Sequence, residues 1–182
     1  MRNIIAGLFI TLDGVVESPD KWSFDHFDEG MLEALQSHLA EQDTALLGRV
    51  TYEEWADYWP TSTDEPFASY INNVPKLVVS RTLQKTAWNN STLLQGDLAN
   101  EIARLKQQPG KNIGTAGSPT LVRSLLENNL LDRLILMVYP VIAGSGKRLF
   151  REGANLKRMR LVESKQTPTG VMILTYQPYS QA

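Results

Sequence analysis

The feature that most constrains the fold is a repeated alternation between short apolar runs and amphipathic helical patterns. The run 44–47, for example, ends at a glycine and is followed by aromatic residues at helical spacing. Short runs of this kind predict buried strands, and apolar residues spaced three and four apart predict helices with one apolar face. The expected strands are 4–12, 44–47, 76–80, 92–95, 112–115, 134–141, 161–165 and 171–176, and the expected helices are 28–39, 51–59, 98–105 and 118–126.

Strands and helices alternate until the end of the chain, where two strands follow each other around Pro168-Thr169-Gly170. This alternation favours a mostly parallel sheet with helices on both faces, and the final pair favours a C-terminal antiparallel hairpin. The 182 residues contain no internal repeat and no linker-like segment. We therefore expect a single α/β domain spanning 1–182.

The composition argues against several classes of function. The chain has no cysteine and two histidines that lack metal-ligand spacing, so we expect neither disulfides nor a metal site. A net charge of −2 gives no overall attraction to nucleic acid or to an anionic membrane. No apolar run approaches the ~18 residues of a membrane span, and the N-terminus does not have the pattern of a signal peptide. We expect a cytoplasmic protein whose ligand is a small molecule.

Two strand-to-helix junctions have compositions that suit a bound phosphate. Gly48-Arg49-Val50-Thr51 combines a glycine, which allows close backbone approach, with a helix start and a guanidinium. Ser80-Arg81 follows the next strand and offers a hydroxyl and a second guanidinium. Both junctions should lie at the carboxyl ends of parallel strands, where ligands of open α/β sheets bind. A solvent-facing turn at Arg49 and a simple strand cap at Ser80 are the open alternatives.

Two glycine-rich segments add to this pattern. The segment 114–119 joins a strand to a helix and places Ser118 as the expected N-cap before a proline. The segment 143–148, with Gly144, Gly146 and Lys147, is suited to surround a substrate phosphate with backbone N–H groups and cations. Ordinary helix capping and a flexible basic turn are the respective alternatives.

Isolated polar residues give weaker signals. Asp28 precedes a helix, where a carboxylate stabilises the helix dipole without any further role. We interpret His26 as a packing or surface residue, and we expect His38 to be solvated. The segment 15–27 has no readable period.

The order of the segments is more informative than any one of them, because together they resemble the dihydrofolate reductase superfamily over nearly the whole chain. The segments that carry this resemblance are Thr11-Leu12-Asp13-Gly14, Leu47-Gly48-Arg49-Val50-Thr51-Tyr52-Glu53, Leu77-Val78-Val79-Ser80-Arg81 and Gly117-Ser118-Pro119-Thr120-Leu121. The distal segments 130–134 and 140–150 resemble the branch that contains the reductase domain of the riboflavin-biosynthesis deaminase-reductase and its stand-alone relatives. The resemblance implies a dihydrofolate reductase-like three-layer fold.

The resemblance also implies that the chain binds NADPH, and it assigns residues to the cofactor and to a substrate. The implied cofactor contacts are Ala6, Gly7, Gly48, Arg49, Thr51, Ser80, Arg81, Ala116, Gly117 and Ser118. The implied substrate contacts are Asp13, Gly14, Trp22, Gly144, Gly146 and Lys147. Ser80 and Arg81 match the segment that contacts the ribose phosphate, which favours NADPH over NADH.

The implied activity is an NADPH-dependent reduction of an electron-poor C=N or C=O carbon in a heterocyclic or ribosylamine-like substrate. An example is the 5-amino-6-ribosylaminouracil phosphate of the riboflavin pathway. Asp28 is the candidate proton donor, with ordered water as the default. A true dihydrofolate reductase and a non-catalytic NADP(H)-binding sensor or scaffold stay open as alternatives. Similarity also implies a homodimer, for which the edge of the terminal hairpin offers a surface.

Overall fold

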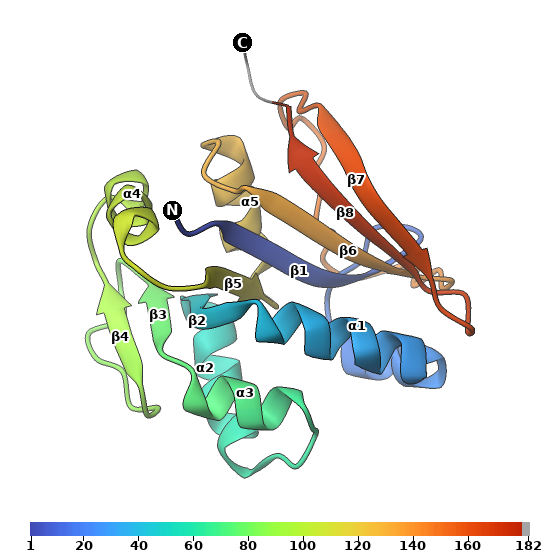
Figure 1. The fold of residues 1–182 in the computed structure, drawn as a ribbon, viewed down its shortest axis with the longest axis horizontal. Coiled ribbons are helices and arrows are strands. Elements are labelled where there is room, and N and C mark those ends of the chain that lie inside the picture. The colour runs from blue at the N-terminus through green and yellow to red at the C-terminus, as the bar shows by residue number, and fades with distance from the viewer. Residues whose placement is uncertain (180–182) are drawn as a thin grey trace.

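The fold is built on one eight-stranded sheet with the order β4-β3-β2-β5-β1-β6-β8-β7, shown in Figure 1. The computed structural model describes residues 1–179. The strands are β1 Ile4–Thr11, β2 Gln42–Gly48, β3 Lys76–Val79, β4 Ser91–Leu94, β5 Asn112–Ala116, β6 Arg133–Tyr139, β7 Met159–Gln166 and β8 Met172–Pro178. In this order, every pair of adjacent strands from β4 through β6 is parallel, whereas β8 is antiparallel to both of its neighbours, β6 and β7. The carboxyl ends of the parallel strands therefore lie at one edge.

The helices follow the predicted pattern with one addition. They are α1 Glu29–Ala40, α2 Arg49–Tyr58, α3 Phe67–Asn73, α4 Leu98–Gln107 and α5 Pro119–Glu127, with short 3-10 turns at Pro19–Lys21, Phe24–His26 and Trp59–Thr61. The sequence did not predict α3, because its seven residues give too few apolar repeats to show a helical period. Helix α2 begins at Arg49 rather than near Thr51.

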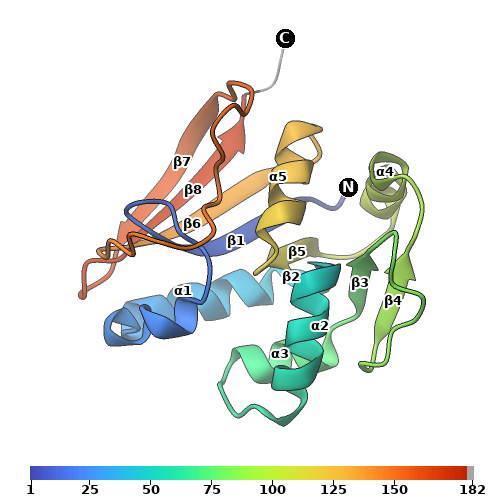
Figure 2. The same cartoon turned by 180° about the vertical axis from the view of Figure 1, so that it is seen from behind.

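The sheet lies between two layers of helices. Helix α1 lies in front of the sheet in Figure 1, and α5 lies in front of it in the reverse view of Figure 2. Successive side chains of a strand point to opposite faces, so Ile4 packs in the cluster with Leu125 of α5, whereas Ile5 packs with Met31 of α1. Burial of one such side chain contributes roughly 1.5–3 kcal/mol. The predicted arrangement of helices on both faces is confirmed.

The C-terminal hairpin is also confirmed. The Thr167 amide donates to the Val171 carbonyl across the turn at 2.9 Å, and β7 and β8 pair along their length. Strand β7 forms the edge of the sheet, and 160–166 are all exposed. The expected homodimer at this edge stays a prediction. None of the helices in residues 1–179 is long and apolar enough to cross a bilayer.

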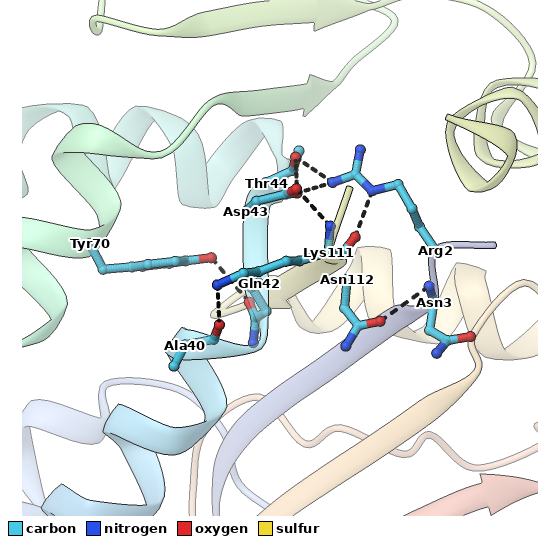
Figure 3. Close-up of polar contacts among 9 residues, drawn as sticks. All are labelled: Arg2, Asn3, Ala40, Gln42, Asp43, Thr44, Tyr70, Lys111 and Asn112. Atoms are coloured by element: carbon cyan, nitrogen blue, oxygen red, sulfur yellow. Dashed lines mark hydrogen bonds and ion pairs between the residues drawn. The ribbon is translucent and has the colours of Figure 1, made fainter. Parts of the chain in front are cut away.

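The amino-terminal edge of the sheet is held by a buried guanidinium, as Figure 3 shows. Arg2 is 7% exposed and pairs with the Asp43 carboxylate. It also donates to the Thr44 hydroxyl at 2.7 Å and to the Lys111 carbonyl at 2.7 Å. Buried charges need such partners because desolvation is costly. These contacts tie β1, β2 and the start of β5 together at the edge opposite the carboxyl ends, so this edge is structural.

A second buried cation, Lys76, lies at the start of β3. Its ammonium donates to the carbonyls of Ile71 at 2.8 Å and Val74 at 3.0 Å, at the C-terminal end of α3. The ammonium lies 4.5 Å from the centroid of the Trp88 ring. Burial lowers the pKa of Lys76 to about 8 from 10.5.

This shift predicts a pH dependence of stability. Between pH 8 and 10.5 the unfolded chain binds more protons at this lysine than the folded chain does. The contribution of Lys76 to the free energy of unfolding therefore increases with pH across this window. We expect urea denaturation to show wild type gaining stability relative to Lys76→Met between these pH values. The exposed Lys85→Met is the control, and equal pH dependence of wild type and Lys76→Met would contradict the assignment.

Candidate active site

The structure brings two of the predicted junctions into direct contact. The Thr51 hydroxyl, in the first turn of α2, donates to the Gly117 carbonyl at 2.6 Å. The Gly48 amide donates to the Ser118 hydroxyl at 3.1 Å. The segment that follows β2 and the segment that follows β5 therefore form one unit at the carboxyl edge, although about 70 residues separate them.

The two glycines of this unit differ in backbone conformation and in the space around them. Gly117 has φ +62, and a Cβ there would lie 2.5 Å from Cζ2 of Trp55 and 3.3 Å from Cγ2 of Thr51. Gly48 has an ordinary φ of −77, and its Cβ would lie 3.7 Å from the nearest side-chain atoms. The fold thus requires a glycine at 117, whereas a Cβ at position 48 would make ordinary van der Waals contacts with Leu121 and Ser118.

The N-termini of α2 and α5 lack side-chain caps within the described chain, unlike those of α1 and α4. Asp28 accepts a hydrogen bond from the third residue of α1, and Asp97 does the same in α4. Ser118 occupies the N-cap position of α5, but its hydroxyl accepts from Gly48 instead of from its own helix. The expected capping role of this hydroxyl is therefore wrong. Two helix starts with free N–H groups, joined at one edge of the sheet, form an arrangement that suits an anion.

Two arginines lie at this edge. Arg49 starts α2, and its exposed guanidinium pairs with Glu53 one turn later at 2.6 Å. Arg81 follows β3, which neighbours β2 in the sheet, and it is exposed with no hydrogen-bond partner among residues 1–179. The buried Ser80 hydroxyl accepts from the amides of Thr82 at 3.1 Å and Leu83 at 2.9 Å. These hydrogen bonds cap the end of β3, which is the alternative that the sequence left open for Ser80.

Ala6 and Gly7 lie in β1, and their contact with a cofactor stays a prediction. Both are buried in the middle of β1, whereas the carboxyl end of this strand is Thr11. A Cβ on Gly7 would lie 2.7 Å from Nε2 of His38, which fills the space beside it. His38 is therefore not solvated as expected, and burial lowers its pKa to about 4. A side chain at position 7 would therefore require His38 to move.

The loops after β1 and β6 are joined through Asp13. Its carboxylate accepts from the Thr11 hydroxyl at 2.7 Å and from the amides of Ala143 at 3.0 Å and Gly144 at 2.9 Å. These hydrogen bonds, that of Thr11 foremost, lower the pKa of Asp13 to about 2. Arg148 adds a guanidinium 3.4 Å from the same carboxylate.

Glu17 makes a second connection between the same loops. It accepts from the backbone amide of Lys147 at 3.2 Å and from its ammonium at 2.9 Å. These hydrogen bonds lower the pKa of Glu17. The amides of Ala143, Gly144 and Lys147 thus hold two carboxylates of the protein. The role of Gly144, Gly146 and Lys147 toward a substrate stays a prediction.

A cavity of about 420 Å³ lies between the two loops. Its lining residues are Val15, Glu17, Ser18, Lys21, Trp22, Ala143, Ser145 and Gly146. The predicted substrate residues Trp22 and Gly146 are in this wall, and Asp13, Gly14, Gly144 and Lys147 lie in the loops that form it. The sequence missed Glu17 and Ser18, because 15–27 has no period and Glu17 pairs with a residue 130 positions away. A second cavity of about 560 Å³, beside the end of α2 and Trp88, includes none of the predicted site residues.

Asp28 has a structural environment that does not suit a proton donor. Its carboxylate accepts from the Met31 amide at 2.9 Å and from the amide and hydroxyl of Thr169, each at 2.8 Å. Desolvation would raise the pKa of Asp28, but these hydrogen bonds outweigh it and lower the pKa to about 2. A carboxyl with this pKa carries no proton at neutral pH. Asp28 instead ties α1 to the terminal hairpin.

The fold and these junctions define a class of protein before any relative is considered. A mostly parallel sheet with helices on both faces and C-terminal antiparallel strands is the dihydrofolate reductase-like architecture. The model of the RibD C-terminal domain family matches residues 2–173, and the chain belongs to this family. Because this is a reductase family of riboflavin biosynthesis, membership supports a reductase-like role.

The chain is also similar to individual proteins and solved structures. The chain is 29% identical to YyaP of Bacillus subtilis, covering 96% of this chain and 94% of YyaP, and 29% identical to YwjB of the same organism, covering 94% and 96%. Among solved structures, a putative riboflavin biosynthesis protein from Shewanella sp. PV-4 has a TM-score of 0.78 at 20% identity, covering 98% and 99%. A pyrimidine reductase-like protein from Corynebacterium diphtheriae has a TM-score of 0.69 at 14% identity, covering 99% and 93%. These structures share the fold.

The contact between the two junctions predicts unequal costs for two glycine substitutions. Gly117 and Gly144 both have positive φ, +62 and +75, but a Cβ on Gly144 would meet nothing within 4 Å. Gly144→Ala should cost about 1–2 kcal/mol for the left-handed backbone. Gly117→Ala should cost about 1–3 kcal/mol more, because Trp55 and Thr51 must shift. Equal free energies of unfolding for the two variants, from urea denaturation, would contradict the described packing.

The environment of Asp28 predicts a stability effect that disappears in acid. Asp28→Ala should lower Tm at neutral pH by roughly 2–4 °C through loss of the N-cap. Because the pKa of the folded state is below the ordinary 3.8, the contribution of this carboxylate is present above pH 3.8 and is lost as pH falls toward about 2. Thermal unfolding of both proteins across this range tests the prediction. A Tm difference that persists at pH 2 would show that the carboxylate charge is not involved.

Proposed function

We propose that the chain is an NADPH-dependent reductase of a small molecule. The observation that carries this proposal is the pair of uncapped helix starts, α2 and α5, held side by side by the hydrogen bond from Thr51 to Gly117. Their free N–H groups suit the phosphates of a dinucleotide. Family membership supports the same class of reaction.

The residues at the carboxyl edge fit the phosphates of such a cofactor. Arg49 adds a charge at the start of α2, and Arg81 has no hydrogen-bond partner within residues 1–179. Arg81 is the proposed ligand of a ribose 2′-phosphate, since a guanidinium matches phosphate geometry. A bound nicotinamide dinucleotide supplies the hydride.

The chain's own residues then bind and orient the substrate. The cavity between the loops has a half-buried indole, Trp22, whose N–H donates to the Glu17 carbonyl at 3.0 Å and is thereby fixed. When the hydride adds to a C=N or C=O carbon, a proton must reach the nitrogen or oxygen. Asp28 is ionised and fully hydrogen-bonded, so we assign this proton to ordered water.

Dihydrofolate reduction is less well supported by the site. Recognition of a pterin needs a carboxylate free to accept from the ligand, and the carboxylates of Asp13 and Asp28 are occupied by protein donors. A sensor that binds NADPH without turnover is distinguished by the absence of NADPH consumption with any reducible heterocycle. A place in the cytoplasm and a homodimer stay predictions.

The assignment of Arg81 predicts a preference between dinucleotides. NADPH should raise Tm more than NADH does at the same concentration, because a ligand that binds the folded state stabilises it. A charge-assisted hydrogen bond contributes about 1.5–3 kcal/mol, so Arg81→Ala should weaken NADPH binding roughly tenfold to a hundredfold and leave NADH unchanged.

The matched control is Arg104→Ala on α4, which removes an exposed arginine paired with Glu101 at 2.7 Å. This variant should keep the preference for NADPH. Equal Tm shifts with the two dinucleotides in the wild type would reject the 2′-phosphate site. No shift with either would reject the proposed function itself.

A further inference from the structure

We propose that Asp13 is a positioning residue of the cavity between the loops: its carboxylate holds the loop after β6 so that the tip of this loop, Ser145-Gly146, binds a phosphate group of the substrate together with Lys21. Asp13 acts through the loop in this role and does not touch the ligand. This inference rests on the proposed function, since it assigns a subsite within the same candidate active site. It concerns the loops after β1 and β6 and not the helix starts that are proposed to hold the cofactor.

The loop after β6 is fastened to the loop after β1 on both sides of its tip. Before the tip, the Leu12 amide donates to the Val141 carbonyl at 2.8 Å, and after the tip the Val16 amide donates to the Lys147 carbonyl at 2.9 Å. Between these contacts, Ser145-Gly146 makes no hydrogen bond to any residue in 1–179. The tip is therefore a short segment that is held at both ends and open in the middle.

Asp13 sets the course of the chain immediately before the tip. One oxygen of its carboxylate accepts from the Ala143 amide at 3.0 Å, and the other accepts from the Gly144 amide at 2.9 Å. The Thr11 hydroxyl donates to the carboxylate at 2.7 Å and holds it in place. Because hydrogen bonds to a charged acceptor are stronger than neutral ones, two successive peptide groups are fixed in orientation. The chain then turns at Gly144, which has φ +75, and enters the tip.

The tip has the character of an anion-binding turn. Ser145 and Gly146 are part of the cavity wall, and Gly146 has φ +122. A Cβ on Gly146 would lie 2.7 Å from Cγ1 of Val15, so the backbone of the tip packs directly against the loop after β1. Successive backbone N–H groups in turns of this kind form concave sites for anions. The amides of Ser145 and Gly146 have no acceptor within residues 1–179, so they are free to donate to a ligand.

The balance of charge in the lining favours a negative ligand. Glu17 is paired, since it accepts from the amide of Lys147 at 3.2 Å and from its ammonium at 2.9 Å. Asp13 is balanced by Arg148, whose guanidinium lies 3.4 Å from the carboxylate. Lys21 is the other charged residue of the lining, and its ammonium makes no ion pair or hydrogen bond within residues 1–179. The free donors of the cavity thus include two amides and one cation, which suit a phosphate monoester.

The test compares ribose 5-phosphate with ribose as probes in calorimetric titrations of the NADPH-saturated protein. Wild type should bind the phosphorylated sugar at least tenfold more tightly. Asp13→Asn keeps the shape of the side chain but leaves one oxygen to accept from two amides. It should therefore lower the affinity for ribose 5-phosphate at least tenfold and leave the affinity for ribose unchanged. Lys21→Met, which removes the unpaired cation of the lining, should have the same effect.

Asp132→Asn is the matched control for Asp13→Asn. The Asp132 carboxylate also holds a backbone amide and a cation, since it accepts from the Ile4 amide at 2.7 Å and from the Lys106 ammonium at 2.8 Å. Ile4 is at the start of β1, at the end of the strand opposite the cavity. Asp132→Asn should lower the free energy of unfolding but keep the preference for ribose 5-phosphate. The ratio of the two sugar affinities therefore separates positioning from stability.

Three kinds of result would overturn the inference. Equal affinity of wild type for the two sugars, or no binding of ribose 5-phosphate, would show that the tip is not a phosphate subsite. An unchanged preference in Asp13→Asn, or an equal loss of preference in Asp132→Asn, would show that Asp13 does not position the tip. Weaker binding of NADPH by Lys21→Met than by the surface control Lys85→Met would assign the subsite to the cofactor instead of the substrate.

Two further measurements keep the test independent of folding and of the cofactor. If Asp13→Asn does not fold, Thr11→Val removes the hydroxyl that donates to the carboxylate, and it should show the same loss in smaller measure. A prior titration of wild type with NADPH alone tests the proposed function, so failure of cofactor binding is recorded separately from the response of the tip to phosphate.

Discussion

The hydrogen bond from the Thr51 hydroxyl to the Gly117 carbonyl is the contact on which the proposed cofactor site depends. It exists because Gly117 adopts φ +62 and has no Cβ, which allows Trp55 and Thr51 of α2 to pack against the turn after β5. The parallel sheet brings both turns to the same edge, since β5 pairs with β2. One left-handed glycine therefore sets the relative position of two helix starts, and the arrangement suits an anion without any charged side chain.

The carboxylates of Asp13 and Glu17 impose a different constraint on the substrate side. Each joins the loop after β1 to the loop after β6 by accepting hydrogen bonds from backbone groups of the second loop. The same contacts order the two loops that line the cavity. These loops and the junctions at the starts of α2 and α5 lie in separate segments of the chain.

The sequence predicted the strands and most helices because their apolar periods are local. It missed α3, which is too short to show a period, and it placed His38 in solvent because the space left by Gly7 on another element is not visible locally. At the site, the glycines and arginines were predicted from composition. The partners of Ser118, Asp13 and Glu17 were not, since each bonds across 70 or more residues of chain and such pairing depends on the assembled sheet.

We propose that the paired helix starts of α2 and α5 bind the phosphates of NADPH. The most direct measurement is a crystal structure of the protein soaked with NADPH. We expect the pyrophosphate within hydrogen-bond distance of the first-turn amides of both helices, and the 2′-phosphate beside Arg81. A dinucleotide bound elsewhere, or bound with its phosphates away from Gly48 and Gly117, would contradict the account.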